Sequence, residues 1–141
     1  MPLINFGSIL GFAEGMEKQN LDFFLSAANT PGCAAYQSLF DGLIKNSRKH
    51  IKDIQRTRRE NVTEMILESI EGFFREPFVL ETKHAPGMDV DGIFKTAGTL
   101  IERSIRYYGE AAVKLKGQSE VSGTLKNLGK KYKRDLDKLV K

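Results

Sequence analysis

The sequence has 141 residues, 40% of them hydrophobic and 28% charged, a composition typical of one soluble globular domain. Its 22 lysines and arginines exceed its 18 acids by only four, so net charge alone does not indicate an acidic partner. A single cysteine, Cys33, excludes an intramolecular disulfide and a cysteine-ligated metal cluster, and it fits a reducing compartment.

The first residues of the chain do not have the pattern of a signal peptide. Residues 1–13 are apolar, but they carry no basic residue and pass directly into a periodic helical pattern that starts near Glu14. No stretch approaches the roughly 18 apolar residues needed to cross a bilayer. We therefore expect a cytoplasmic protein that does not engage a membrane.

Residues 3–58 predict a first helical hairpin. Residues 3–29 carry a heptad-like apolar stripe that is interrupted by Glu17, and Thr30-Pro31-Gly32 predicts the turn that ends this helix. A second helix from about residue 34 also has one apolar face. There, Ser47 and His50 occupy positions where apolar residues would continue the stripe.

Residues 60–88 predict a crossover between two hairpins. A short helix, or an extension of the second one, could include Val62, Met65, Ile66, Ile70 and Phe73. Phe78-Val79-Leu80 looks extended, and His84 fits a surface loop. A connection of this length can carry the chain from one end of a bundle to the other.

Residues 89–141 predict a second hairpin. Asp89 is a suitable N-cap for a helix that reaches about residue 115, with Glu102 at the border of its apolar face. Ser119 can cap a fourth helix, in which Asp135 lies on the apolar face seven residues after Leu128. Together the segments predict an all-α fold, a four-helix bundle in a single domain spanning 1–141.

The two hairpins repeat each other at an offset of 85 residues. This offset pairs Glu17 with Glu102 and His50 with Asp135, and it matches apolar positions with apolar positions along both hairpins. Polar groups in two equivalent apolar stripes would meet inside one bundle, where buried carboxylates require a compensating partner.

This arrangement resembles the ferritin-like, rubrerythrin-type bundle, in which a Glu on two helices and Glu-x-x-His on the other two hold two metal ions. Glu17 and Glu102 match the family's Glu helices, and His50 and Asp135 match the ends of its ligand pairs. Ser47 and Tyr132 stand where the family has bridging glutamates.

For the ligands that this chain retains, the resemblance implies one divalent metal ion, with iron first and manganese or zinc as alternatives. These ligands do not suit a full di-iron centre. The implied ligands are Glu17, His50, Glu102 and Asp135, with Ser47 and Tyr132 as auxiliary groups. No catalytic residue is identified, and whether the chain is a metal-dependent oxidoreductase stays open. A homodimer is a further expectation from the family.

A metal-free interaction scaffold is the first alternative. Glu17 and Asp135 could hydrogen-bond Tyr132, Ser47 or His50, and the ring of Tyr132 could fill the volume of an ion. Glu102 would then pair with Arg106 or Lys95 near the surface.

Nucleic-acid binding is the second alternative, because the second and fourth helices each carry a basic face. The corresponding residues are Lys45, Arg48 and Lys49 on one helix and Lys130, Lys133 and Arg134 on the other. Such faces could contact a phosphate backbone, although a solvated helix face is the more common meaning of the pattern.

Overall fold

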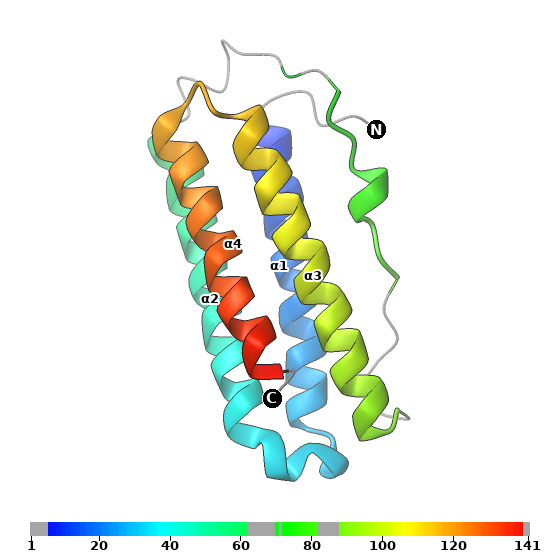
Figure 1. Ribbon diagram of the computed structural model, residues 1–141. Coiled ribbons are helices and arrows are strands. Elements are labelled where there is room, and N and C mark those ends of the chain that lie inside the picture. The colour runs from blue at the N-terminus through cyan, green and yellow to red at the C-terminus, as the bar shows by residue number, and fades with distance from the viewer. Residues whose placement is uncertain (1–5, 62–69, 71, 82–87, 140–141) are drawn as a thin grey trace.

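The computed structural model describes residues 6–61, 70, 72–81 and 88–139, and these residues form a bundle of long helices (Figure 1). The α-helices are α1 (Phe6–Ala28), α2 (Gln37–Glu60), α3 (Val90–Lys114) and α4 (Ser119–Leu139), and the short 3-10 helices are η1 (Pro31–Tyr36) and η3 (Glu76–Phe78). The prediction of an all-α four-helix bundle is confirmed.

The helix ends follow local sequence signals. The side chain of Asp89 accepts a hydrogen bond of 2.7 Å from the backbone N–H of Gly92, which caps α3 as predicted. Pro31 stands at the start of η1, and Cys33 is completely buried within this turn. Because the chain forms a 3-10 helix here, α2 begins at Gln37 rather than at the expected residue 34.

The four helices form two antiparallel hairpins packed side by side. α1 pairs with α2 and α3 pairs with α4, while α1 also contacts α3 and α2 contacts α4 (Figure 1). α3 begins at the opposite end of the bundle from the end of α2, so α2 and α3 run in the same direction. Each of these four neighbouring pairs is therefore antiparallel.

The described part of the crossover is attached to α1 and α3. The Gln19 side-chain amide donates to the carbonyl of Leu80 at 2.7 Å, and Arg103 Nη1 donates to the carbonyl of Phe78 at 2.9 Å. The ring of Phe78 is buried with its centroid 5.1 Å from that of Tyr107. Phe78 ends the 3-10 helix η3, so the extended conformation expected for residues 78–80 starts only at Val79.

The buried positions show that the two hairpins repeat with two different offsets. On α2 and α4, Leu43 and Leu128 are both buried, in agreement with the offset of 85. On α1 and α3 the buried residues correspond at an offset of 84, and the matched pairs include Ile9 with Ile93, Ala13 with Ala97, Met16 with Leu100 and Phe24 with Tyr108. The single offset expected from the sequence is therefore wrong for the first and third helices.

The predicted helix through Val62, Met65 and Ile66 and the surface loop at His84 lie outside the described residues. Ile70 and Phe73 are described and are not helical, so the expectation that the helix includes them is wrong. Among the helices that the structure does describe, none is both long and apolar enough to traverse a bilayer.

Candidate functional site

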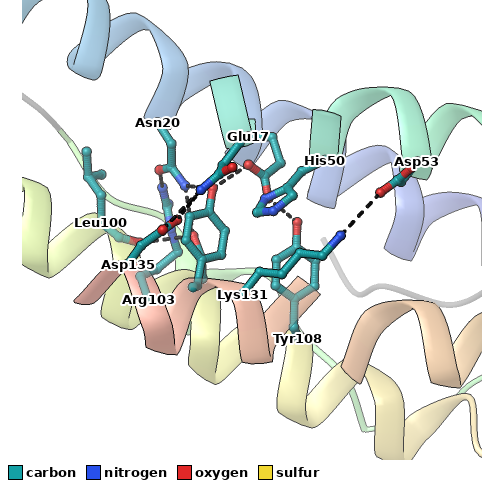
Figure 2. A network of polar contacts seen from close by, with 12 residues as sticks. Glu17, Asn20, His50, Asp53, Leu100, Arg103, Tyr108, Lys131 and Asp135 are labelled. Carbon is teal, nitrogen blue, oxygen red and sulfur yellow. Dashed lines mark hydrogen bonds and ion pairs between the residues drawn. The ribbon is translucent and has the colours of Figure 1, made fainter. Parts of the chain in front are cut away.

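A network of buried polar side chains lies in the middle of the bundle, with Glu17 on α1 at its centre (Figure 2). Oε1 of Glu17 accepts a hydrogen bond from the Tyr132 hydroxyl, and Oε2 accepts one from the Tyr108 hydroxyl. His50 Nδ1 lies 3.3 Å from Oε2. Each of the other three helices thus contributes one side chain to this carboxylate of α1, which has no exposed surface.

The two tyrosines keep the protonated phenol, which donates a hydrogen bond to this carboxylate. Complete burial raises the pKa of both Tyr108 and Tyr132 well above the ordinary value, and the negative charge of Glu17 raises it further. The rings of the two residues stack with centroids 6.2 Å apart. Their phenols therefore stay protonated and act as hydrogen-bond donors.

Arg103 on α3 supplies a positive charge to one side of the network. Its Nη2 donates to Gln19 Oε1 at 2.8 Å and to Asn20 Oδ1 at 3.0 Å. Asn20 in turn donates to the hydroxyls of Ser104 and Tyr132. Burial lowers the pKa of Arg103, while the negative charge of Glu17 opposes that shift. A guanidinium stays charged in proteins, so Arg103 balances Glu17 through hydrogen bonds that pass by way of Asn20 and Tyr132.

Asp135 on α4 belongs to a second branch, next to His50. Its carboxylate accepts hydrogen bonds from the Asn46 amide at 3.0 and 3.2 Å. Burial raises its pKa, with a smaller contribution from Glu17, and the Asn46 hydrogen bonds and the positive charge of Lys138 oppose the shift. Asp135 is thus tied to α2 and makes no hydrogen bond with Glu17 among the contacts of the described residues.

The structure brings together five of the six residues singled out from the sequence. Glu17, Ser47, His50, Tyr132 and Asp135 are all buried in the core between the helices. Glu102 is exposed to solvent, so the expectation that its side chain enters this core is wrong. Glu102 lies near the surface, as the metal-free alternative expects, but no ion pair joins it to Arg106 or Lys95 in the described part of the chain, so only that pairing is wrong.

The one-residue change of offset explains the position of Glu102. Each residue of an α-helix turns the side-chain direction by about 100°, so an error of one residue moves a side chain from the core to the surface. At the observed offset, Glu17 corresponds to Ile101, which is buried, and Asn20 corresponds to Ser104, to which it is hydrogen-bonded. The second hairpin therefore has no acid equivalent to Glu17.

Sequence reasoning did not single out Arg103, Asn46 or Tyr108 as residues of the site. Arg103 carries a recognisable signal, because it follows Leu100 by three residues and precedes Tyr107 by four, the spacing of one buried helix face. Asn46 is only partly buried beside the stripe of α2, and its spacing carries no comparable signal.

The comparisons with known proteins give no independent assignment: no family model, no curated protein and no solved structure matches this chain.

The four ligands implied by the ferritin-like resemblance do not form one donor set. Glu102 is on the surface, and Asp135 is engaged by Asn46. Within the described residues there is no group of three or more His, Cys, Asp or Glu side chains placed to hold a metal ion. The residues that do surround Glu17 are one imidazole and two protonated phenols.

Proposed function

We propose that this protein is a ferritin-like bundle that works as a metal-free interaction scaffold rather than as a metal-dependent oxidoreductase. The observation that carries the proposal is the pairing of Glu17, whose two carboxylate oxygens both accept hydrogen bonds from tyrosines. Because a buried carboxylate must be compensated, these donors do what a cation would otherwise do.

The charges around the network support the same proposal. Arg103 lies within hydrogen-bonding distance of Asn20, which itself contacts Tyr132, so a fixed positive charge is already close to Glu17. A metal ion bound to the phenol oxygens would have to displace two protons whose pKa values are raised by burial. Both effects weaken metal binding at this position.

A second candidate function is suggested by the same four side chains. Glu17, His50, Tyr108 and Tyr132 provide a carboxylate, an imidazole and two phenols from four different helices. Hard oxygen donors with one imidazole suit iron, and a site of this composition would hold a single ion. It differs from the set implied by the sequence in using Tyr108 and Tyr132 in place of Glu102 and Asp135.

Metal analysis separates the two candidates. The full chain is purified without chelator, its metal content is measured, and its melting temperature is compared with and without added iron, manganese or zinc. The scaffold proposal expects well under about one-tenth of an ion per chain and no stabilisation by metal. A stoichiometric ion, with a visible absorption band from tyrosine bound to iron, would overturn it.

Matched variants show whether any bound ion occupies this site. Glu17→Gln should abolish iron binding if the ion is bound at Glu17. Glu102→Gln changes an exposed acid and should leave iron binding intact. If both variants retain the ion, it is bound elsewhere. A homodimer and a nucleic-acid contact remain predictions from the sequence.

A further inference from the structure

A small pocket lies at the contact between α2 and α4, next to the polar core. Its volume is about 220 Å³. Four basic side chains line it, Lys49 from α2 and Lys131, Arg134 and Lys138 from α4. Asn46, His50 and Asp135 complete the lining. The antiparallel pairing of α2 and α4 thus gathers cations from both helices around one recess.

His50 gives this pocket a buried polar atom that no protein group satisfies. The residue has no exposed surface, and its Nε2 has no hydrogen-bond partner among the described residues. Nδ1 lies against Glu17 Oε2, and a carboxylate only accepts hydrogen bonds, so Nδ1 carries a proton. Nε2 is the ring's other nitrogen and is directed away from Glu17; on a ring whose single proton is on Nδ1, it is free to accept a hydrogen bond, for example from a phosphate hydroxyl.

The balance of charge in the pocket favours an anion. Lys49 and Arg134 form no ion pair with any described residue, while Lys131 lies 3.9 Å from Asp53. Asp135 is the only acid in the lining, and its two oxygens already accept hydrogen bonds from Asn46. Four cations around one compensated carboxylate attract anions and repel a divalent metal ion.

We propose that the pocket between α2 and α4 binds a phosphate group, with Lys49 and Arg134 pairing with its oxygens and His50 Nε2 contacting it from the buried side. A dianion of tetrahedral shape can use donors from both helices at once. The pocket is smaller than the roughly 300 Å³ of typical sites for drug-sized ligands, which fits a phosphate group rather than a large organic body.

Calorimetric titration with inorganic phosphate tests the proposal on the full chain. The double variant Lys49→Gln/Arg134→Gln is compared with Lys45→Gln/Lys130→Gln, which removes the same two charges one turn earlier on the same helices. Lys45 and Lys130 are exposed and do not line the pocket. We expect the first variant to weaken phosphate binding about tenfold or more and the second to change it less than about twofold.

Nitrogen NMR of the imidazole rings supplies a readout that depends on the buried side of the pocket. Phosphate should shift the Nε2 resonance of His50 in the wild type and in the Lys45→Gln/Lys130→Gln variant, at phosphate concentrations where the Lys49→Gln/Arg134→Gln variant shows no shift. No measurable phosphate binding, equal weakening in both double variants, or an unchanged Nε2 resonance would each overturn the proposal.

Competition distinguishes a phosphate pocket from a basic surface. A phosphomonoester should compete with inorganic phosphate, and tighter binding of the ester would identify the ligand as a larger molecule with a terminal phosphate. A DNA duplex without terminal phosphates should not displace phosphate. Displacement by the duplex, weakened equally by both double variants, would contradict the pocket and favour a nucleic-acid surface.

Discussion

At the scale of single residues, the core depends on how one carboxylate is compensated. Glu17 has no exposed surface, yet each of its oxygens accepts a hydrogen bond from a tyrosine. Removing one partner from such a set is more destabilising than removing all of them, because unpaired buried donors keep their full desolvation penalty. The network can therefore be tested by comparing partial with complete removal.

Glu17→Leu should lower the free energy of unfolding by at least about 2 kcal/mol, because it leaves the hydroxyls of Tyr108 and Tyr132 without an acceptor. The triple variant Glu17→Leu/Tyr108→Phe/Tyr132→Phe should recover much of this loss. Urea denaturation measures both effects. Glu102→Leu, at an exposed site, should stay within about 0.5 kcal/mol of the wild type. A stabilising Glu17→Leu would show that Glu17 is not compensated in the folded protein.

Asp135 should make stability depend on pH in an unusual direction for an acid. Its pKa is raised in the folded state by burial, so the folded state holds the proton more tightly than the unfolded state does. As pH rises from the unfolded value of about 3.9 through the raised folded value, the contribution of Asp135 therefore becomes less favourable to folding. The groups that act on its charge are Asn46, Lys138, His50 and Glu17.

Asp135→Asn isolates this effect. The difference in unfolding free energy between Asp135→Asn and the wild type should shift in favour of the variant between about pH 4 and about pH 7. Any fixed loss from altered contacts with Asn46 is the same at both values and cancels. Asp137→Asn, an exposed acid on the same helix, should show no such trend. A shift of the opposite sign would contradict a raised pKa.

At the scale of helices, the sequence predicts the number, order and approximate ends of the helices, and it predicts the interior of α2 and α4 closely. Ser47, His50, Tyr132 and Asp135 are all buried as expected, because their positions follow directly from long apolar stripes. The position of Glu102 could not be predicted as well. It lies at the border of an apolar stripe, where an error of one residue in the repeat offset decides whether a side chain points to the core or to solvent.

The hydrogen bonds of Arg103 could not be predicted, because they depend on tertiary packing. Its guanidinium joins α3 to α1 through Asn20 and to the crossover through Phe78. No spacing within a single helix identifies such partners. The sequence shows only that an arginine occupies a position expected to be buried.

Arg103→Met should release the described part of the crossover. The carbonyl of Phe78 and the side chain of Asn20 would lose their donor, which we expect to lower the unfolding free energy by at least about 2 kcal/mol. Hydrogen–deuterium exchange over residues 76–81 should become faster than in the wild type. Arg106→Met is the matched control, because Arg106 is exposed and lies over the ring face of Phe78 without a hydrogen bond to the described part of the crossover. Equal effects of the two variants would show that Arg103 does not anchor this segment.

At the scale of the whole molecule, the network ties the two hairpins into one cooperative unit. Glu17 and His50 belong to the first hairpin, whereas Tyr108 and Tyr132 belong to the second. Either hairpin alone would expose an apolar face and leave its polar residues without partners. The antiparallel contact of every neighbouring pair also sets opposite helix dipoles side by side.

Separate hairpins should therefore be largely unfolded. A fragment of residues 1–61 and one of residues 88–141 should each show little helix by circular dichroism, and mixing them should restore helix. Glu17→Leu in the first fragment should weaken this association, whereas Glu102→Leu in the second should not. A first fragment that is stably helical by itself would contradict the cooperative role of the network.

The burial of Cys33 has a practical consequence. Its sulfur lies in the turn that joins α1 to α2, with no exposed surface and with a pKa raised by burial. A thiol reagent can reach it only when that end of the bundle opens, so the rate of labelling measures how often this happens. The chain thus contains its own single-site probe of local opening, at the end of α2 opposite the one where the crossover begins.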